Sequence, residues 1–347
     1  MQFCGQDFPM DTEEIDCVNE SIHSLAPLSG LENLRKLRLS FTDPHVSQVH
    51  PLSDLSPLKD LRKLEVLEVP ESEVSDLGSL KELKNLTSLD LHSTFVQDLS
   101  PLGGLTRLSR LNVADTNVKN LDALKGLPEL TALRVNFTAV GSLEPLRGMQ
   151  RLEELAIYGT AVEDLTPIAD LKVVREGRRL DLGGTRVTDL SVLDNAGQMK
   201  ELFLFNTPVR DLGPLRHMTE LEYLRLDNTP TEDLGPLKNL RRLERLILSG
   251  TSVAYVSALS NLNALRELDL EGTKISDLEP LRGLKNLERL VLAGTKVRDL
   301  SPLSELSSLK VLDVRDTPIE DGQLSELKRS MPGLTVLSSS TTGGRLQ

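Results

Sequence analysis

Few residues in this 347-residue sequence combine the types and spacing that catalysis needs. Cys4, Cys17 and His23 lie close together in the sequence, and a thiol beside an imidazole could serve as a nucleophile with its base. No third group that would orient the base is specified, so we expect no catalytic site and no enzyme activity. The two cysteines are interpreted as free thiols, with a disulfide at the N-terminal end of the chain as the alternative.

Two histidines raise the question of a metal site. His45 and His50 lie within residues 43–54, which read DPHVSQVHPLSD. Two imidazoles and a nearby Asp are fewer ligands than a closed zinc site uses. We interpret the segment as a solvated loop and predict neither a bound metal nor a cofactor.

Aromatic side chains offer chemistry of another kind, that of recognition. Tyr, Trp and Arg dominate the energetics of protein interfaces, because large rings fill pockets and guanidinium groups stack on them. The chain has 3 tyrosines and 7 phenylalanines, and five of these rings fall between positions 137 and 223 with charged side chains among them. The predicted partner-binding residues are Phe137, Tyr158, Phe203, Phe205, Tyr223, Arg134, Arg179, Arg225 and Asp227.

A repeated line of sequence determines where these side chains lie. Residues 287–306 read LERLVLAGTKVRDLSPLSEL, with leucines at fixed positions before a threonine and an Asp-Leu-x-Pro-Leu run after it. The line occurs 13 times, in steps of 22 residues except for one step of 30 and one of 25. The threonine position holds Thr42, Ser72, Thr94, Thr116, Thr138, Thr160, Thr185, Thr207, Thr229, Thr251, Thr273, Thr295 and Thr317. A fixed period of this length predicts stacked coils that share one core.

The line resembles the leucine-rich repeat, most closely the 22-residue internalin-like and SDS22-like types, over about residues 20–337. Thr or Ser stands where the family usually has Asn. The resemblance implies an α/β leucine-rich-repeat solenoid dominated by β-strands, with a parallel sheet on the concave face, short 3₁₀ turns on the convex face and a single curved domain. Internalin-like members are surface adhesins, and SDS22-like members are cytosolic scaffolds that regulate a phosphatase, so both roles are open here.

Leucines alternate with polar residues before each threonine, which predicts a short strand with one buried face. The outward-facing positions are those six, four, two and one before each threonine, and all nine predicted partner-binding residues occupy them. The core does not need aromatic side chains at these positions, which favours a binding role. The alternative is that Phe203 and Phe205 stack on neighbouring strands and fill the curve.

The threonine and the segment after it predict the turns. We expect the threonine hydroxyl to donate to a backbone carbonyl of the adjoining coil. Glycine precedes it at Gly159, Gly184, Gly250, Gly272 and Gly294, which predicts a backbone conformation that side chains resist. Ser100-Pro101 and Ser301-Pro302 are typical of a cap followed by Pro at the start of a short helix, here a 3₁₀ turn.

The two ends of the chain depart from the repeat. Residues 1–34 are predicted to be an N-terminal leader and cap coil, and residues 35–320 the 13 repeats. Residues 321–337 are predicted to be a C-terminal cap of a helix and a short strand, and residues 338–347 a flexible tail. Between Thr160 and Thr185 the repeat is lengthened around Val173–Gly177, where arginines cluster.

The formal net charge is −12, and much of it comes from an Asp four residues after the repeat threonine in 9 of the 13 copies. These carboxylates are interpreted as turn formers. The acidic balance argues against nucleic acid as a partner, and no apolar run predicts membrane insertion. Residues 1–11 lack the basic start and apolar stretch of a signal peptide, which predicts a cytoplasmic location. Secretion or translocation into a host is the alternative.

Together these observations predict a non-catalytic, monomeric protein–protein interaction module that binds a protein or peptide partner on the concave face. The alternatives are a regulatory scaffold of a phosphatase or another enzyme, a secreted or translocated bacterial adhesin or effector, and a self-assembling structural solenoid. Replacing Phe203 and Tyr223 with Ala is expected to leave the fold unchanged while weakening the partner about tenfold or more.

Overall fold

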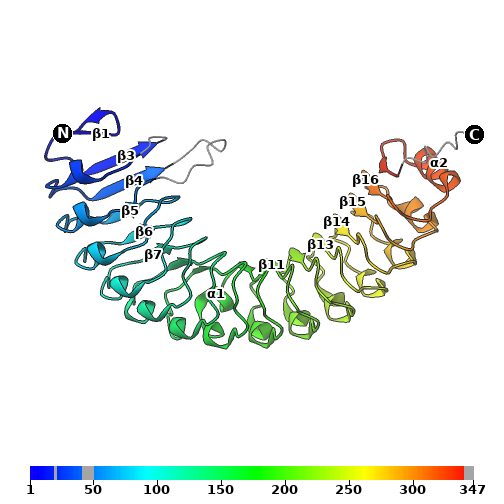
Figure 1. The fold of residues 1–347 in the computed structure, drawn as a ribbon. Coiled ribbons are helices and arrows are strands. Elements are labelled where there is room, and N and C mark those ends of the chain that lie inside the picture. Colours follow the sequence, from blue (N-terminus) through cyan, green and yellow to red (C-terminus); the bar gives the residue numbers. More distant parts are fainter. Residues whose placement is uncertain (19–21, 41–50, 340–347) are drawn as a thin grey trace, which may run out of the picture. The chain divides into compact units, whose positions relative to one another are not determined.

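The structure, a computed structural model, describes residues 1–18, 22–40 and 51–339. The chain forms two compact units, residues 1–174 and residues 175–347. In each unit the strands line the inner side of an arc and the 3₁₀ turns line its outer side (Figure 1). The predicted repeat solenoid of parallel strands and 3₁₀ turns is confirmed. The single domain stays a prediction.

The first unit carries a seven-stranded sheet in the order β3-β4-β5-β6-β7-β8-β9, preceded by the antiparallel hairpin of β1 and β2. The sheet pairs are parallel and in register, so equivalent repeat positions lie side by side, as Ser88, Arg110 and Ala132 do. The strands are β1 Gln2–Phe3, β2 Gln6–Asp7, β3 Glu14–Val18, β4 Lys36–Ser40, β5 Val66–Glu68, β6 Ser88–Asp90, β7 Arg110–Asn112, β8 Ala132–Arg134 and β9 Glu154–Ala156.

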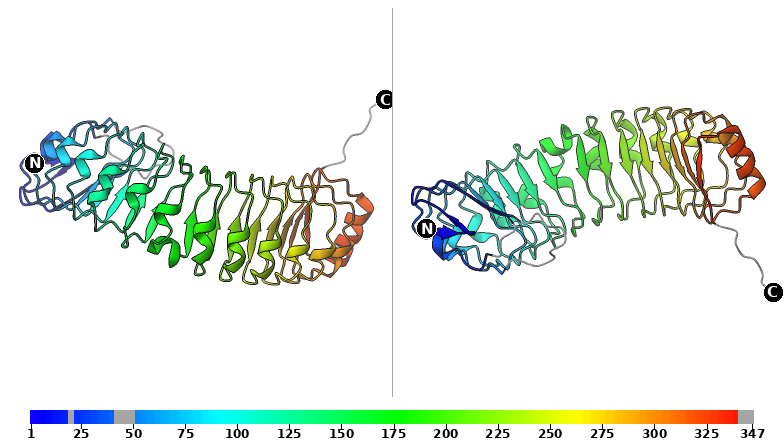
Figure 2. Two further views of the ribbon diagram at one scale, coloured as in Figure 1. Left: turned by 90° about the horizontal axis from the view of Figure 1, so that it is seen from below. Right: turned by 90° about the horizontal axis from the view of Figure 1, so that it is seen from above.

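The second unit carries an eight-stranded parallel sheet in the order β10 to β17. The right-hand view of Figure 2 shows its strands side by side and pointing the same way. The strands are β10 Arg179–Asp181, β11 Glu201–Phe203, β12 Tyr223–Arg225, β13 Arg245–Ile247, β14 Glu267–Asp269, β15 Arg289–Val291, β16 Val311–Asp313 and β17 Thr335–Leu337. The helix α2 (Asp321–Ser330) precedes β17, within the segment predicted to hold a helix and a strand.

Short helical turns connect the strands on the outer side of each arc. The helix α1 (Lys172–Arg175) lies where the repeat is lengthened, and it buries Val173 and Val174, so one helical turn accommodates the extra residues. The 3₁₀ helices are η1 Ala26–Leu28, η2 Ser56–Leu58, η3 Gly78–Leu80, η4 Ser100–Leu102, η5 Asp122–Gly126, η6 Glu144–Leu146, η7 Thr166–Ile168, η8 Ser191–Asn195, η9 Gly213–His217, η10 Gly235–Asn239, η11 Ser257–Leu259, η12 Glu279–Leu281 and η13 Ser301–Glu305.

The core of each coil is a layer of aliphatic side chains. Leu86, Leu89 and Leu91 of one coil are buried, and the equivalent residues of the neighbouring coils are buried as well. Complete burial of such a side chain contributes about 1.5–3 kcal/mol. Because the core occupies one face of every strand, only the outward-facing positions are available for function.

The repeat threonine is satisfied within its own coil, and the prediction that it bonds to the adjoining coil is wrong. The Thr94 hydroxyl donates to the Leu91 carbonyl, three residues earlier, at 2.7 Å. Ser72 makes the same bond to Val69. The preceding residue is left-handed (φ 55° at Ser93), and this sharp turn brings the hydroxyl back to the end of its own strand.

The left-handed conformation recurs before the repeat threonine or serine in every described copy. The prediction from the five glycines is therefore confirmed. The same position also holds Glu71, Ser93, Asp115, Phe137, Asn206, Asn228 and Asp316, all with positive φ. Asn and Asp tolerate this conformation, whereas for a bulky ring it is a strained outlier.

Where the repeat aspartate is present, it caps the 3₁₀ turn, and the serine that follows it does not. Asp98 accepts hydrogen bonds from the Ser100 backbone N–H at 2.8 Å and from the Ser100 hydroxyl at 2.7 Å. Asp299 holds Ser301 in the same way. The interpretation of these carboxylates as turn formers is confirmed, while the predicted serine caps are corrected.

Cys4 and Cys17 form a disulfide, which contradicts the interpretation as free thiols. The hairpin of β1 and β2 folds back beside the sheet, and β3 directs Cys17 to its buried side. The two Cα atoms are 6.0 Å apart across 13 residues of sequence. The leader is therefore attached to the first coil, a proximity that composition alone could not reveal.

Some predictions concern residues outside the described part of the chain. His45, His50 and Thr42 belong to this group, as do residues 340–347 of the tail. Within the described residues, no helix combines the length and apolar character that crossing a membrane requires.

Candidate functional site

The nine predicted partner-binding residues form two groups on the inner faces of the sheets or at their edges. The first unit holds Arg134, Phe137 and Tyr158. The second unit holds Arg179, Phe203, Phe205, Tyr223, Arg225 and Asp227. Each group makes its own internal contacts.

In the second unit, four side chains form a continuous row, here called the Arg–Tyr row, across β10 to β13. The Arg179 guanidinium lies 4.5 Å from the centre of the Phe203 ring. The Phe203 and Tyr223 rings meet edge to face, with centroids 5.0 Å apart. The Arg245 guanidinium lies 4.3 Å from the centre of the Tyr223 ring. Each cation–π contact contributes about 0.5–1 kcal/mol when exposed, so the row stabilises its own arrangement.

The parallel register aligns three members of this row, and the fourth, Phe203, lies two residues after the equivalent position on β11. Arg179, Glu201, Tyr223 and Arg245 occupy the same repeat position on successive strands. Arg179 also donates to Glu201 at 2.9 Å, and Arg245 donates to Glu267 at 2.9 Å. Both guanidinium groups are thus held by a ring and a carboxylate. Arg245 was not predicted from the sequence, although it lies at the same repeat position as Arg179 and Tyr223.

Two of the predicted anchors are buried. Phe203 is 6% exposed and Phe205 is 9% exposed. The Phe205 ring packs against Gly183, where an added Cβ would come within 2.2 Å of Phe205 Cε1. The Arg225 guanidinium covers the Phe205 ring, 4.2 Å from the ring centre. The expectation that these two rings are exposed is wrong, and the alternative that they stack and fill the curve holds. Tyr223 and the arginines form the accessible surface.

Arg225 and Asp227 make a two-point ion pair, with N–H to carboxylate distances of 2.7 and 3.2 Å. The hydrogen bond to Asp227 raises the pKa of Arg225 above the ordinary value of an arginine, whereas burial acts to lower that pKa. On β10, two strands away, burial raises the pKa of Asp181, opposed by the Gly183 backbone N–H and by the charges of Arg179 and Arg225. Charged groups on this face therefore satisfy one another.

The cluster in the first unit is built on a strained and exposed ring. Phe137 is 55% exposed and has a φ of 55°. Its ring meets Tyr158 edge to face, with centroids 4.5 Å apart. Gly159 leaves room for it, because a Cβ there would lie 2.9 Å from Phe137 Cδ1. Strain in a non-glycine residue amounts to about 1–3 kcal/mol and is often retained at functional positions. Arg134, on the same unit, pairs with Glu154 at 2.6 Å.

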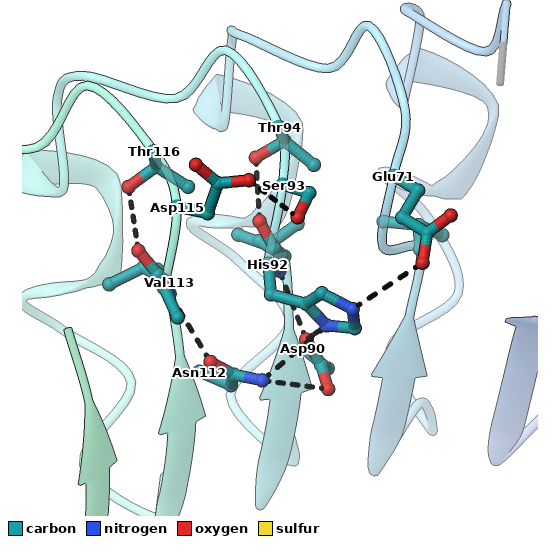
Figure 3. A network of polar contacts seen from close by, with 12 residues as sticks. Glu71, Asp90, His92, Ser93, Thr94, Asn112, Val113, Asp115 and Thr116 are labelled. Atoms are coloured by element: carbon teal, nitrogen blue, oxygen red, sulfur yellow. Dashed lines mark hydrogen bonds and ion pairs between the residues drawn. The ribbon is translucent and has the colours of Figure 1, made fainter. Parts of the chain in front are cut away.

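Sequence reasoning missed a polar network on β6 and β7 and the turns that follow (Figure 3). His92 Nδ1 lies 2.8 Å from Asp90 Oδ1, which also accepts the His92 backbone N–H at 3.0 Å. Asn112 Nδ2 donates to the other oxygen of Asp90 at 3.1 Å. His92 Nε2 points toward Glu71 at 3.8 Å. The sequence signal was the Asp-x-His pair at two outward-facing positions of one coil.

The protonation states of the network follow from these contacts. The hydrogen bond to Asp90 raises the pKa of His92 against the opposing effect of burial, and the negative charges of Asp90, Glu71 and Asp115 add to the rise. Burial acts to raise the pKa of Asp90, but the hydrogen bonds from His92 and Asn112 outweigh it, so the pKa is lowered.

The network does not resemble a catalytic site. The Ser93 hydroxyl donates to Asp115 at 2.9 Å, so it is not directed at the His92 imidazole as a nucleophile would be. Among the described residues, no group of three or more His, Cys, Asp or Glu side chains could hold a metal ion.

Comparisons with known proteins agree with the fold. The family model described as Leucine Rich repeats (2 copies) matches residues 241–283. No curated protein matches the chain. An internalin (inlF) from Listeria monocytogenes has a similar structure, with a TM-score of 0.77 and 27% identity, covering 86% of each chain.

Two further solved structures show the fold alone, because their identities are low. A leucine-rich repeat protein from Leptospira interrogans has a TM-score of 0.69 and 19% identity, covering 94% of this chain and 96% of that one. The plant peptide hormone receptor RGFR1 in complex with RGF2 has a TM-score of 0.62 and 15% identity, covering 96% of this chain and 68% of the receptor. The repeats, the stacked coils and these matches show that the chain carries leucine-rich repeats and that its structure is similar to that of an internalin.

Proposed function

We propose that this chain is a non-catalytic protein-interaction module whose second unit binds a protein or peptide segment on the inner face of its sheet. The Arg–Tyr row carries the proposal. Tyr and Arg are the residues most enriched among those that dominate interface energetics. The solenoid core does not require them at these outward-facing positions, since aliphatic layers fill the interior.

Preorganisation supports this function. Binding normally orders long side chains at about 0.5–1.5 kcal/mol each. Arg179 and Arg245 are already held by a ring and a carboxylate, so less of that entropy remains to be lost. Both side chains remain more than half exposed.

The row indicates what kind of segment it binds. A guanidinium has five N–H donors, and Arg179 donates one of them to Glu201. The others can donate to main-chain carbonyls of an extended peptide. The half-buried Tyr223 ring, which contacts Phe203 and Arg245, suits an apolar or aromatic side chain. The function is therefore recognition of a polypeptide, with Tyr223 as the central anchor.

The comparisons support polypeptide binding on this fold, because the plant receptor RGFR1 is solved in complex with RGF2. The Cys4–Cys17 disulfide favours an oxidising compartment. With the likeness to a Listeria internalin, it favours a secreted or translocated protein over a cytoplasmic one. A scaffold that regulates a phosphatase or another enzyme is the alternative.

The test uses the intact wild-type protein to select binding peptides from a random display library. The affinity of each selected peptide is then measured for the wild type and for two variants. Tyr223→Ala removes the anchor, and Tyr255→Ala is the matched control, because Tyr255 is 82% exposed in the same unit and belongs to no strand. We expect Tyr223→Ala to weaken the peptides about tenfold or more and Tyr255→Ala to leave them unchanged. Equal affinities for all three proteins would remove the row from the proposal. Phe203 stays intact in the test, because losing a buried ring would mix folding effects with binding effects.

A further inference from the structure

Arg110 on β7 stands apart from the other basic side chains of the inner faces. Its neighbours at the same repeat position are Ser88 on β6 and Ala132 on β8, both too short and uncharged to pair with it. Among the described residues it is the one arginine or lysine at an outward-facing strand position that makes no side-chain hydrogen bond or ion pair. The others pair with carboxylates, as Lys36 does with Glu14 and Arg134 with Glu154.

A hollow of about 260 Å³ opens on the inner face of the first unit beside Arg110. The small side chains at 88 and 132 leave this space on either side of the guanidinium stem. The charged side chains that line the hollow are Glu68, Asp90, Arg110, Arg134 and Glu154. It is too small for a drug-sized ligand, which usually occupies about 300–1,000 Å³, and it suits one side chain.

The other charged groups around the hollow are already engaged. Glu68 accepts from Arg38 at 3.2 Å, and Glu154 accepts from Arg134 at 2.7 Å. Asp90 is held by His92 and Asn112, as Figure 3 shows. The charge left uncompensated in the hollow is therefore the positive charge of Arg110.

We propose that this hollow binds the carboxylate of an Asp or Glu side chain from a polypeptide partner, with Arg110 as the recognising group. A planar guanidinium matches a carboxylate with two parallel N–H···O bonds. A single negative charge fits better than a phosphate, because it matches the single uncompensated charge of Arg110, whereas the second charge of a phosphate would find no free cation among the groups that line the hollow. The site lies in the first unit and does not depend on the Arg–Tyr row of the second.

The experiment uses the full chain labelled with ¹⁵N and follows the arginine Nε–H signals by NMR. Arg110→Lys identifies the Arg110 signal by its disappearance. The probes are three capped pentapeptides with two serines on each side of a central residue, which is glutamate, glutamine or phosphoserine. We expect the glutamate peptide to shift the Arg110 signal at millimolar concentration and to bind about fivefold or more tightly than the glutamine peptide.

Two variants complete the test. Arg110→Gln should abolish the preference for glutamate over glutamine, measured on backbone signals of β6 to β8. Arg107→Gln should retain it, because Arg107 is an exposed arginine that bonds to Asn85 and does not line the hollow. Equal binding of the glutamate and glutamine peptides would overturn the proposal, as would tighter binding of the phosphoserine peptide. Because Tyr223 is intact in every sample, failure here leaves the function proposed for the second unit untouched.

Discussion

The ring of Phe205 lies where a side chain at position 183 would have to be. A Cβ on Gly183 would come within 2.2 Å of Phe205 Cε1 and 2.4 Å of Cζ. The guanidinium of Arg225 covers the ring at 4.2 Å from its centre, so the ring has little room to move away. Gly183 thus makes the buried position of Phe205 possible, and through Phe205 it positions Arg225.

Gly183→Ala is expected to destabilise the second unit by about 1–3 kcal/mol, because overpacking forces a ring out of its place. Denaturant unfolding monitored by circular dichroism measures the effect. Gly197→Ala is the control, since nothing lies within 4 Å of a Cβ at that position and its φ is not positive. A Gly183→Ala protein as stable as the control variant would show that Phe205 does not need this space.

Thr94→Val is expected to destabilise the first unit by about 1–3 kcal/mol, because valine keeps the shape but leaves the buried Leu91 carbonyl without the hydroxyl of residue 94. Thr94→Ser keeps the donor, as Ser72 does naturally at this repeat position, and should lose less stability. The midpoints of urea unfolding compare the two variants. If valine were tolerated as well as serine, the bond would not explain why Thr or Ser occupies this position.

The His92–Asp90 contact predicts a pH dependence of stability. The pKa of His92 is raised in the folded state, so its contribution is complete below the ordinary value of 6.5 and is lost as pH rises through the folded pKa. The pKa of Asp90 is lowered, so its contribution is present above 3.8 and is lost as pH falls through its folded pKa. The pair therefore stabilises the fold most between about pH 4 and pH 6.5.

We expect His92→Gln to lower the melting temperature more at pH 5.5 than at pH 8.5, relative to wild type at each pH. In an Asp90→Asn background the same substitution should lose this extra effect, because the coupling partner is absent. A melting-temperature difference that is independent of pH, or that persists unchanged in the double variant, would contradict the coupling.

Much of the fold could be predicted from local pattern. The step of 22 residues, the leucines at fixed positions and the Asp-Leu-x-Pro-Leu run recur in most copies, and the coils fold under the same rules. The left-handed turn was indicated by glycines at 159 and 184, and the structure extends it to residues as bulky as Phe137. The three-residue bond of Thr94 was not predicted, because the pattern shows which residue is polar and not which carbonyl lies nearest.

The candidate site could be predicted only in part. The outward-facing repeat positions followed from strand periodicity, and the rings of the Arg–Tyr row occupy them. Their exposure could not be read in the same way, because Phe203 is covered by Arg179 from β10 and by Tyr223 from β12. Arg245 and the network around His92 were missed because their contacts join side chains of different coils, which the periodicity of one coil does not show.

By itself the sequence determined the period, the aliphatic layers and the face on which each side chain emerges, since these depend on spacing within one coil. Only the tertiary structure decided which of those side chains stay accessible, that Cys4 meets Cys17, and that Arg110 stands alone between Ser88 and Ala132. Those outcomes depend on contacts between coils, where the length and charge of a neighbour 22 residues away determine whether a group is covered, paired or left available.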